Sequence, residues 1–246
     1  MERKHYIDNL RLICILLLFP YHAAMAYNCW GEGNYVLLHA NSWISSFVVL
    51  VSPWYMTLLF VLAGMSTKYS LERRSSGQYL QERCRKLLLP LLAGTLLIMP
   101  VLTYCADYYN CGYAGNFFSH YMVFFCKWTD LTGYDGGFTI GHLWFLLYLF
   151  VISTLSMIVI LLQKKYLPKL NERKIRPLAT AILVMTAMLF LPVKAGGKSI
   201  VTYFLLYLIG YYILSVEDNI TGLQKQKYLY LSVFVVSSAA NVYLFL

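Results

Sequence analysis

Seven apolar stretches, each long enough to cross a lipid bilayer as a helix, constrain this chain more than any other feature of its sequence. A helix rises about 1.5 Å per residue, so about 20 apolar residues cross a hydrocarbon core roughly 30 Å thick. The predicted spans are residues 10–27, 43–66, 87–105, 141–162, 177–193, 199–216 and 228–246. The expected fold class is therefore all-α, a polytopic transmembrane helix bundle of about seven spans.

The composition agrees with this class. Apolar residues make up 59% of the chain and charged residues 13%, compared with roughly 45–50% and 25% in soluble domains. The charged lead-in to the first span lacks a small-residue cleavage site, which favours a retained helix over a signal peptide. The expected partner is thus the lipid bilayer.

Lysine and arginine are distributed very unevenly between the two sides of the membrane. Of the 20 basic residues, only Lys127, Lys194 and Lys198 fall on the side opposite to the N-terminus. The positive-inside rule then places the N-terminus in the cytoplasm. The net charge of +9 is accordingly an orientation signal, and no nucleic-acid partner is expected.

Two loops differ in character. The basic segment 70–86 is expected to lie along the anionic inner leaflet. The segment 106–140, rich in Tyr, Phe, Gly and Asp, is expected to be an outer loop within a single domain of residues 1–246. A loop of this length is often a binding element or a lid.

The first span carries an unusual set of polar residues. Asp8 and Arg11 are three residues apart, so they share a helix face and can form an ion pair. His22 lies eleven residues further on the same face, about 16 Å along the axis, and Pro20 is expected to bend the helix near it. Either these residues face a polar interior that serves a function, or they are a juxtamembrane ion pair and one interhelical hydrogen-bonding histidine. The spacing alone fits both interpretations.

Five motifs in order resemble the integral-membrane acyltransferase 3 family. They are Arg3-x4-Asp8-x2-Arg11-x10-His22, residues 60–64 (FVLAG), residues 83–90 (RCRKLLLP), residues 142–146 (HLWFL) and the aromatic segment 203–211 that ends in Gly-Tyr. Ala63 stands where the family usually has Ser, and Lys86 stands where Arg is common. The family usually has about ten spans, so the resemblance implies a shortened or incomplete member.

The resemblance implies transfer of an acyl group, commonly acetyl, from cytoplasmic acyl-CoA. The implied acceptor is a hydroxyl of a carbohydrate, a glycolipid or another molecule of the cell envelope. The implied location is the bacterial cytoplasmic (inner) membrane, as a multi-pass protein. Acetyl-CoA would be a donor substrate, and no metal is expected, because the histidines are too scattered to suggest a metal site.

The candidate catalytic residues follow from this chemistry. A sugar hydroxyl needs a general base when it attacks a thioester, and His22 suits that role. Arg11 is expected to meet a phosphate or the pantetheine end of the donor, with Asp8 fixing its geometry. His142 is expected to hydrogen-bond the acceptor or polarise the thioester carbonyl.

Donor binding is assigned to a basic cluster at the same inner side, together with Arg11. The cluster consists of Arg83, Arg85 and Lys86. An ordinary set of snorkelling topology determinants would have the same composition.

Other interpretations stay open at this stage. A transporter or flippase of an envelope precursor would also place a histidine in the membrane, although it commonly needs more acidic residues within its spans. A non-catalytic assembly partner is another alternative. The sequence leaves the oligomeric state open, together with the pairing of the outer cysteines, which are Cys29, Cys105, Cys111 and Cys126.

Overall fold

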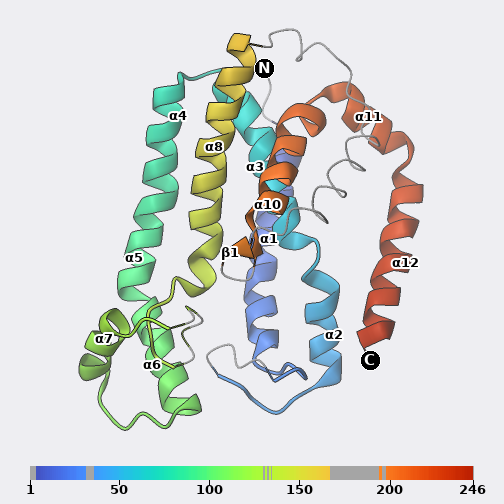
Figure 1. Cartoon of the computed structure of the whole chain (residues 1–246). Helices are drawn as coiled ribbons and strands as arrows, with labels where there is room; N and C mark the ends of the chain where they lie inside the picture. Colours follow the sequence, from blue (N-terminus) through green and yellow to red (C-terminus); the bar gives the residue numbers. More distant parts are fainter. Residues whose placement is uncertain are drawn as a thin grey trace. The chain divides into compact units, whose positions relative to one another are not determined.

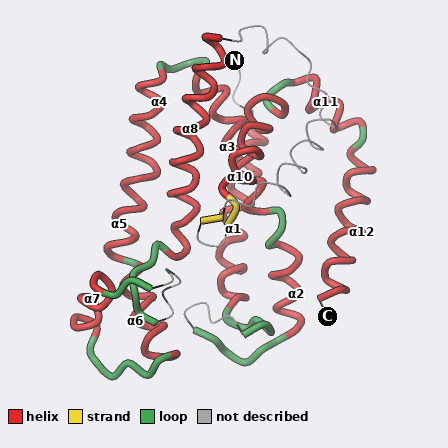
Figure 2. The backbone as a smooth tube through the Cα atoms, viewed as in Figure 1, coloured by secondary structure: helices red, strands yellow, loops and turns green. Residues whose placement is uncertain are grey.

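The computed structural model describes residues 4–31, 36–129, 131, 133, 135–166, 194–195 and 198–245. Helix dominates this part of the chain (Figure 2). The strands within it are β1 (Lys194–Ala195) and β2 (Lys198–Ser199), a short antiparallel pair in which Lys194 faces Ser199. The predicted all-α polytopic class is thus confirmed.

The helices are labelled in Figure 1. The α-helices are α1 (His5–Met25), α2 (Ser42–Val51), α3 (Tyr55–Leu71), α4 (Ser76–Arg83), α5 (Leu89–Leu97), α6 (Met99–Asn110), α7 (Phe117–Cys126), α8 (Trp144–Tyr166), α10 (Ile200–Ile209), α11 (Glu217–Lys225) and α12 (Lys227–Phe245). Two π-helical turns, η1 (Cys84–Leu88) and η4 (Gly210–Leu214), and one 3-10 turn, η2 (Gly141–Leu143), continue or precede them.

Five helical stretches among the described residues are long and apolar enough to cross a membrane. They are His5–Met25, Ser42–Leu71, Ser76–Asn110, Gly141–Tyr166 and Lys227–Phe245. A sixth candidate combines Ile200–Leu214 with Glu217–Lys225, which are bent by 95° at their junction. These six correspond to six of the predicted spans. The other prediction, residues 177–193, lies outside the described residues.

The helix that contains the third predicted span begins before the apolar stretch does. Ser75 caps α4 through the Gln78 N–H, and the Gln78 side chain accepts from the Ser75 N–H, so the two form a capping box. The helix then continues to Asn110. Residues 76–86 are therefore the first turns of this helix. The cap starts the helix before the apolar residues begin.

The described residues form two compact units, each drawn from three separate stretches of chain. The first unit is taken from residues 1–14, 54–84 and 148–237. In it, α3 packs against α10 and η4, and Phe60 stacks on Tyr203 with ring centroids 4.5 Å apart. Gly64 faces the Tyr207 carbonyl and Gly210 faces the Val61 carbonyl, so closely that a Cβ atom at either position would overlap it. Small residues of this kind let membrane helices approach closely.

The second unit is taken from residues 15–53, 85–147 and 238–246. In it, α6 continues from α5 and packs against α7. Gly94 of α5 makes room for Leu143, since a Cβ at Gly94 would lie 2.6 Å from the Leu143 Cδ1 atom. This contact seats η2 on α5. All six cysteines of the chain lie among the described residues and carry free thiols.

The two glycines of the α3 contact predict a stability difference. Gly64→Ala and Gly210→Ala should each lower the free energy of unfolding by about 1–3 kcal/mol, because overpacking forces backbones apart. Thermal unfolding in detergent measures this. Gly77→Ala and Gly222→Ala are matched helical controls with open space around the added Cβ, and helix propensity should make them neutral or slightly stabilising. Equal midpoints for Gly210→Ala and the controls would contradict the close contact.

Candidate functional site

The Arg11 side chain of α1 extends to α3 in the first unit. Its Nη1 atom lies 3.4 Å from the Asp8 Oδ1 atom, so the predicted i,i+3 pair is present. Its Nη2 atom donates to the Ser66 hydroxyl at 2.6 Å, and that hydroxyl donates to the Leu62 carbonyl at 2.7 Å. The position of the guanidinium is thus fixed by residues of two helices, Asp8 of α1 and Ser66 of α3.

Arg83, at the end of α4, is bound to Thr67, the residue of α3 that follows Ser66. Its Nη2 atom donates to the Thr67 hydroxyl at 3.1 Å, and its guanidinium lies 4.9 Å from the centroid of the Tyr79 ring. Thr67 also bonds the hydroxyls of Tyr79 at 2.9 Å and Tyr207 at 2.5 Å, and these two hydroxyls lie 3.0 Å apart. All three hydroxyl-bearing residues are buried. The planar guanidinium stacks on an aromatic face, which a lysine would do less well.

Arg11 and Arg83 therefore converge on consecutive residues of one helix, Ser66 and Thr67. They lie close enough for their charges to interact. Asp8 pairs with Arg11, and within the described residues no carboxylate forms a salt bridge with Arg83. Two fixed guanidiniums this close together, with a salt bridge at Arg11 and none at Arg83, leave a local positive charge. Such a pair is suited to bind an anion.

The predicted basic cluster is divided between helix faces. Arg85 and Lys86 are exposed, whereas Arg83 turns toward Thr67. Successive helical residues are separated by about 100° around the axis, so residues 83 and 85 point in nearly opposite directions. Of these three side chains, Arg83 is the one that is anchored on α3 beside Arg11.

The two predicted histidines are in contact in the second unit. The imidazoles of His22 (α1) and His142 (η2) have centroids 3.9 Å apart at an interplanar angle of 42°. The Nδ1 atom of His22 is buried and has no hydrogen-bond partner among the described residues. Leaving a buried polar atom unpaired costs about 1–3 kcal/mol. The atom is therefore available to a substrate proton.

Local sequence explains how both rings reach this position. Pro20 lies inside α1 near His22, and its missing N–H frees a carbonyl of the preceding turn. On the other side, Gly141 opens η2 with φ of +41°, in the left-handed region that glycine adopts without strain. Leu143, the last residue of η2, packs against Gly94 of α5. His142 lies between Gly141 and Leu143 in the sequence, so these two neighbours fix the direction of its side chain.

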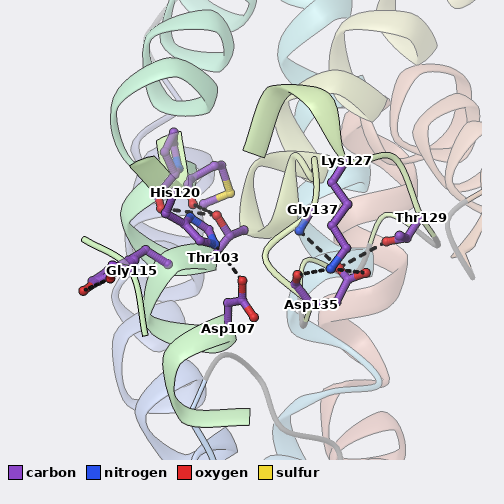
Figure 3. Close-up of polar contacts among 11 residues, drawn as sticks. Thr103, Asp107, Gly115, His120, Lys127, Thr129, Asp135 and Gly137 are labelled. Atoms are coloured by element: carbon purple, nitrogen blue, oxygen red, sulfur yellow. Dashed lines mark hydrogen bonds and ion pairs between the residues drawn. The ribbon is translucent and has the colours of Figure 1, made fainter. Parts of the chain in front are cut away.

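Sequence reasoning missed several residues near these groups. It did not identify Ser66 and Thr67 as anchors of the two arginines, although two adjacent hydroxyls inside an apolar span were a signal. It also missed a buried pair in the segment 106–140, Asp107 and His120, whose Oδ2 and Nε2 atoms lie 3.1 Å apart (Figure 3). No group of three or more metal-binding side chains occurs within the described residues.

The acyltransferase 3 family model, described as an acyltransferase domain, matches residues 4–246 of this chain. Similar curated proteins are the glucans biosynthesis proteins C of Salmonella gallinarum, Salmonella paratyphi B and Salmonella enteritidis. Each is 24% identical over 204 residues, which cover 77% of this chain and 46% of the relative. The chain thus spans about half the length of the curated relatives it matches. No solved structure matches. Because the family model covers nearly all of its residues, the chain belongs to the integral-membrane acyltransferase 3 family.

Proposed function

We propose that this protein transfers an acyl group, commonly acetyl, from acyl-CoA to a hydroxyl group of a carbohydrate or other cell-envelope acceptor. The observation that carries the proposal is the contact of His22 with His142, with the His22 Nδ1 atom buried and unpaired. Family membership supports the acyl-transfer chemistry. The name of the curated relatives, glucans biosynthesis protein C, supports a carbohydrate acceptor.

His22 acts as the general base in this proposal. The acceptor oxygen attacks the thioester carbonyl carbon while its proton passes to the imidazole of His22. The carbon–sulfur bond then breaks, and the same proton is delivered to the departing thiolate. The acceptor becomes an ester and the donor a free thiol, so the reaction needs no other reactant. His142, which lies against the His22 ring, hydrogen-bonds the acceptor or the carbonyl oxygen.

Arg11 and Arg83 bind the anionic part of the donor. Their anchors on Ser66 and Thr67 hold both guanidiniums before the donor arrives, which lowers the entropy lost on binding. Asp8 fixes the direction of Arg11. Arg85 and Lys86 are exposed and contribute charge near the membrane surface.

The distribution of basic residues supports an orientation with Arg11 and Arg83 at the cytoplasmic side, where acyl-CoA is available. We place the protein in the bacterial cytoplasmic membrane, with the segment 106–140 on the outer side. Within α1, His22 is about 16 Å further along the axis than Arg11.

Replacement of His22 tests the general base. His22→Ala and His22→Asn should each lower kcat by about 10²–10⁴-fold, because neither side chain accepts the proton. The donor KM should stay near that of the unchanged protein, since Arg11 and Arg83 are untouched. Steady-state acyl transfer by purified protein in detergent or nanodiscs measures both constants.

His39→Ala is the control for this experiment, because His39 is exposed and has no role in the proposal. Near-normal transfer by both His22 variants would show that His22 is a packing residue.

The divided basic cluster predicts unequal effects of two similar substitutions. Arg83→Ala should raise the donor Kd by about tenfold or more, because a charge-assisted hydrogen bond contributes about 1.5–3 kcal/mol. Arg85→Ala removes the same charge two residues away and should change Kd by no more than about threefold, the effect of an exposed charge. Binding of a non-hydrolysable acyl-CoA analogue measures both. Equal effects would show that the cluster acts only through its total charge.

Single cysteines in a background without the native thiols test the orientation. Gln81→Cys and Lys165→Cys should react with a membrane-impermeant maleimide only after cells are opened. A retained Cys111, which is exposed, should react in intact spheroplasts. Labelling of Lys165→Cys from outside would overturn the orientation and, with it, the cytoplasmic donor site.

A further inference from the structure

A buried acid–base pair lies in the second unit, apart from the two contacting histidines. The His120 Nε2 atom of α7 lies 3.1 Å from the Asp107 Oδ2 atom of α6 (Figure 3). His120 has no exposed surface and Asp107 is 6% exposed. The rings of Tyr104 and Tyr113 stand edge-on to the imidazole, with centroids 5.4 and 4.9 Å away. The pair therefore joins α6 to α7 in a closely packed aromatic environment.

The chain after α7 folds back onto this pair. Gly136, with φ of +80°, approaches so closely that a Cβ atom there would overlap the His120 Nε2 atom and lie 2.6 Å from the Asp107 Oδ2 atom. Gly133, with φ of +82°, packs in the same manner against Thr103 and Thr139. We call residues 133 and 135–141 the return turn. It rests on α6 at Thr103 and on the Asp107–His120 pair.

Lys127 and Thr129 also hold the return turn, through hydrogen bonds to Asp135. Lys127 Nζ donates to the Asp135 carbonyl at 2.6 Å, and the Asp135 carboxylate accepts from Thr129 and from the Gly137 N–H (Figure 3). Burial raises the pKa of Asp135, but these hydrogen bonds and the charge of Lys127 outweigh burial and lower it overall. The carboxylate thus stays ionised at neutral pH and holds the turn together.

The return turn leads directly into η2. The Thr139 hydroxyl donates to the Leu131 carbonyl at 2.6 Å and accepts from the Gly141 N–H at 2.9 Å. Gly141 is the first residue of η2, and His142 follows it. A continuous series of contacts therefore connects the Asp107–His120 pair to the backbone next to His142. That backbone sets the direction in which the His142 ring points.

We propose that Asp107 and His120 are positioning residues for His142: the pair seats the return turn, and the return turn aims the His142 imidazole at His22. The effect on catalysis rests on the proposed function, whereas the effect on the His22–His142 contact does not. A buried pair is suited to this role because removing one partner leaves the other buried without its hydrogen bond. The free-energy cost of that loss makes any displaced arrangement of the pair unfavourable.

Crosslinking tests the position of residue 142 without using acyl transfer. In the full chain with its six native cysteines replaced by Ser or Ala, His22→Cys and His142→Cys are combined and treated with a short bismaleimide. The rate of intramolecular crosslinking is then compared after His120→Ala, Asp107→Ala and His120→Gln. We expect a several-fold lower rate for both alanine variants and recovery in His120→Gln, whose amide donates to Asp107 as the imidazole does.

Two glycines provide a second route that leaves the acid–base pair intact. Gly136→Ala places a Cβ against His120 and Asp107, whereas Gly112→Ala carries similar backbone strain, with φ of +72°, and meets no atom within 4 Å. Crosslinking should be slowed by Gly136→Ala and retained by Gly112→Ala. This comparison separates displacement of the return turn from general strain.

In the protein with both histidines present, His120→Ala should lower kcat by about 10²-fold, the effect of misplacing a catalytic group by about 1 Å. The donor KM should be unchanged, which shows that the variant is folded, and His120→Gln should restore kcat. Wild-type crosslinking rates in His120→Ala and Gly136→Ala would overturn the proposal even if transfer were lost. Slowed crosslinking in a protein that transfers no acyl group would retain the positioning role and overturn only the proposed function.

Discussion

A polar side chain on an apolar membrane helix is expensive unless another part of the protein satisfies it, and this requirement organises both units of the chain. Arg11 is satisfied by Asp8 and Ser66, and Arg83 by Thr67 and the ring of Tyr79. Several buried polar atoms lack a hydrogen-bond partner among the described residues, among them the Nδ1 atoms of His22 and His120.

Glycines determine how closely the elements that carry these groups approach one another. Gly64 and Gly210 allow α3 to contact η4 and α10 through their backbones, and α3 carries the anchors of both arginines. Gly94 allows η2 to rest on α5, and Gly141 adopts the positive φ with which η2 begins, next to the His142 ring that contacts His22. In lipid, where helix association gains little from the hydrophobic effect, such close packing contributes much of the association energy.

The spans were the most predictable feature, because an apolar run of about 20 residues has few alternatives in a bilayer. Six of them are present as helices, and residues 177–193 lie outside the described part of the chain. The helix that contains the third predicted span begins before its apolar run, because the capping box of Ser75 and Gln78 starts it there. The Asp8–Arg11 pair was predictable because it depends only on helical spacing.

The amino-acid sequence alone determined the class of the protein, the expected orientation of its spans and the chemical types of its candidate residues. These depend on hydropathy, on charge and on neighbours three or four positions away. Only the tertiary structure decided which of these residues meet: that His142 contacts His22 across 120 positions of sequence, that Arg83 rather than Arg85 joins Arg11 on α3, and that Asp107 is paired with His120. The physical reason is that these contacts depend on helix rotation and on backbone approach at single glycines, which local spacing does not encode.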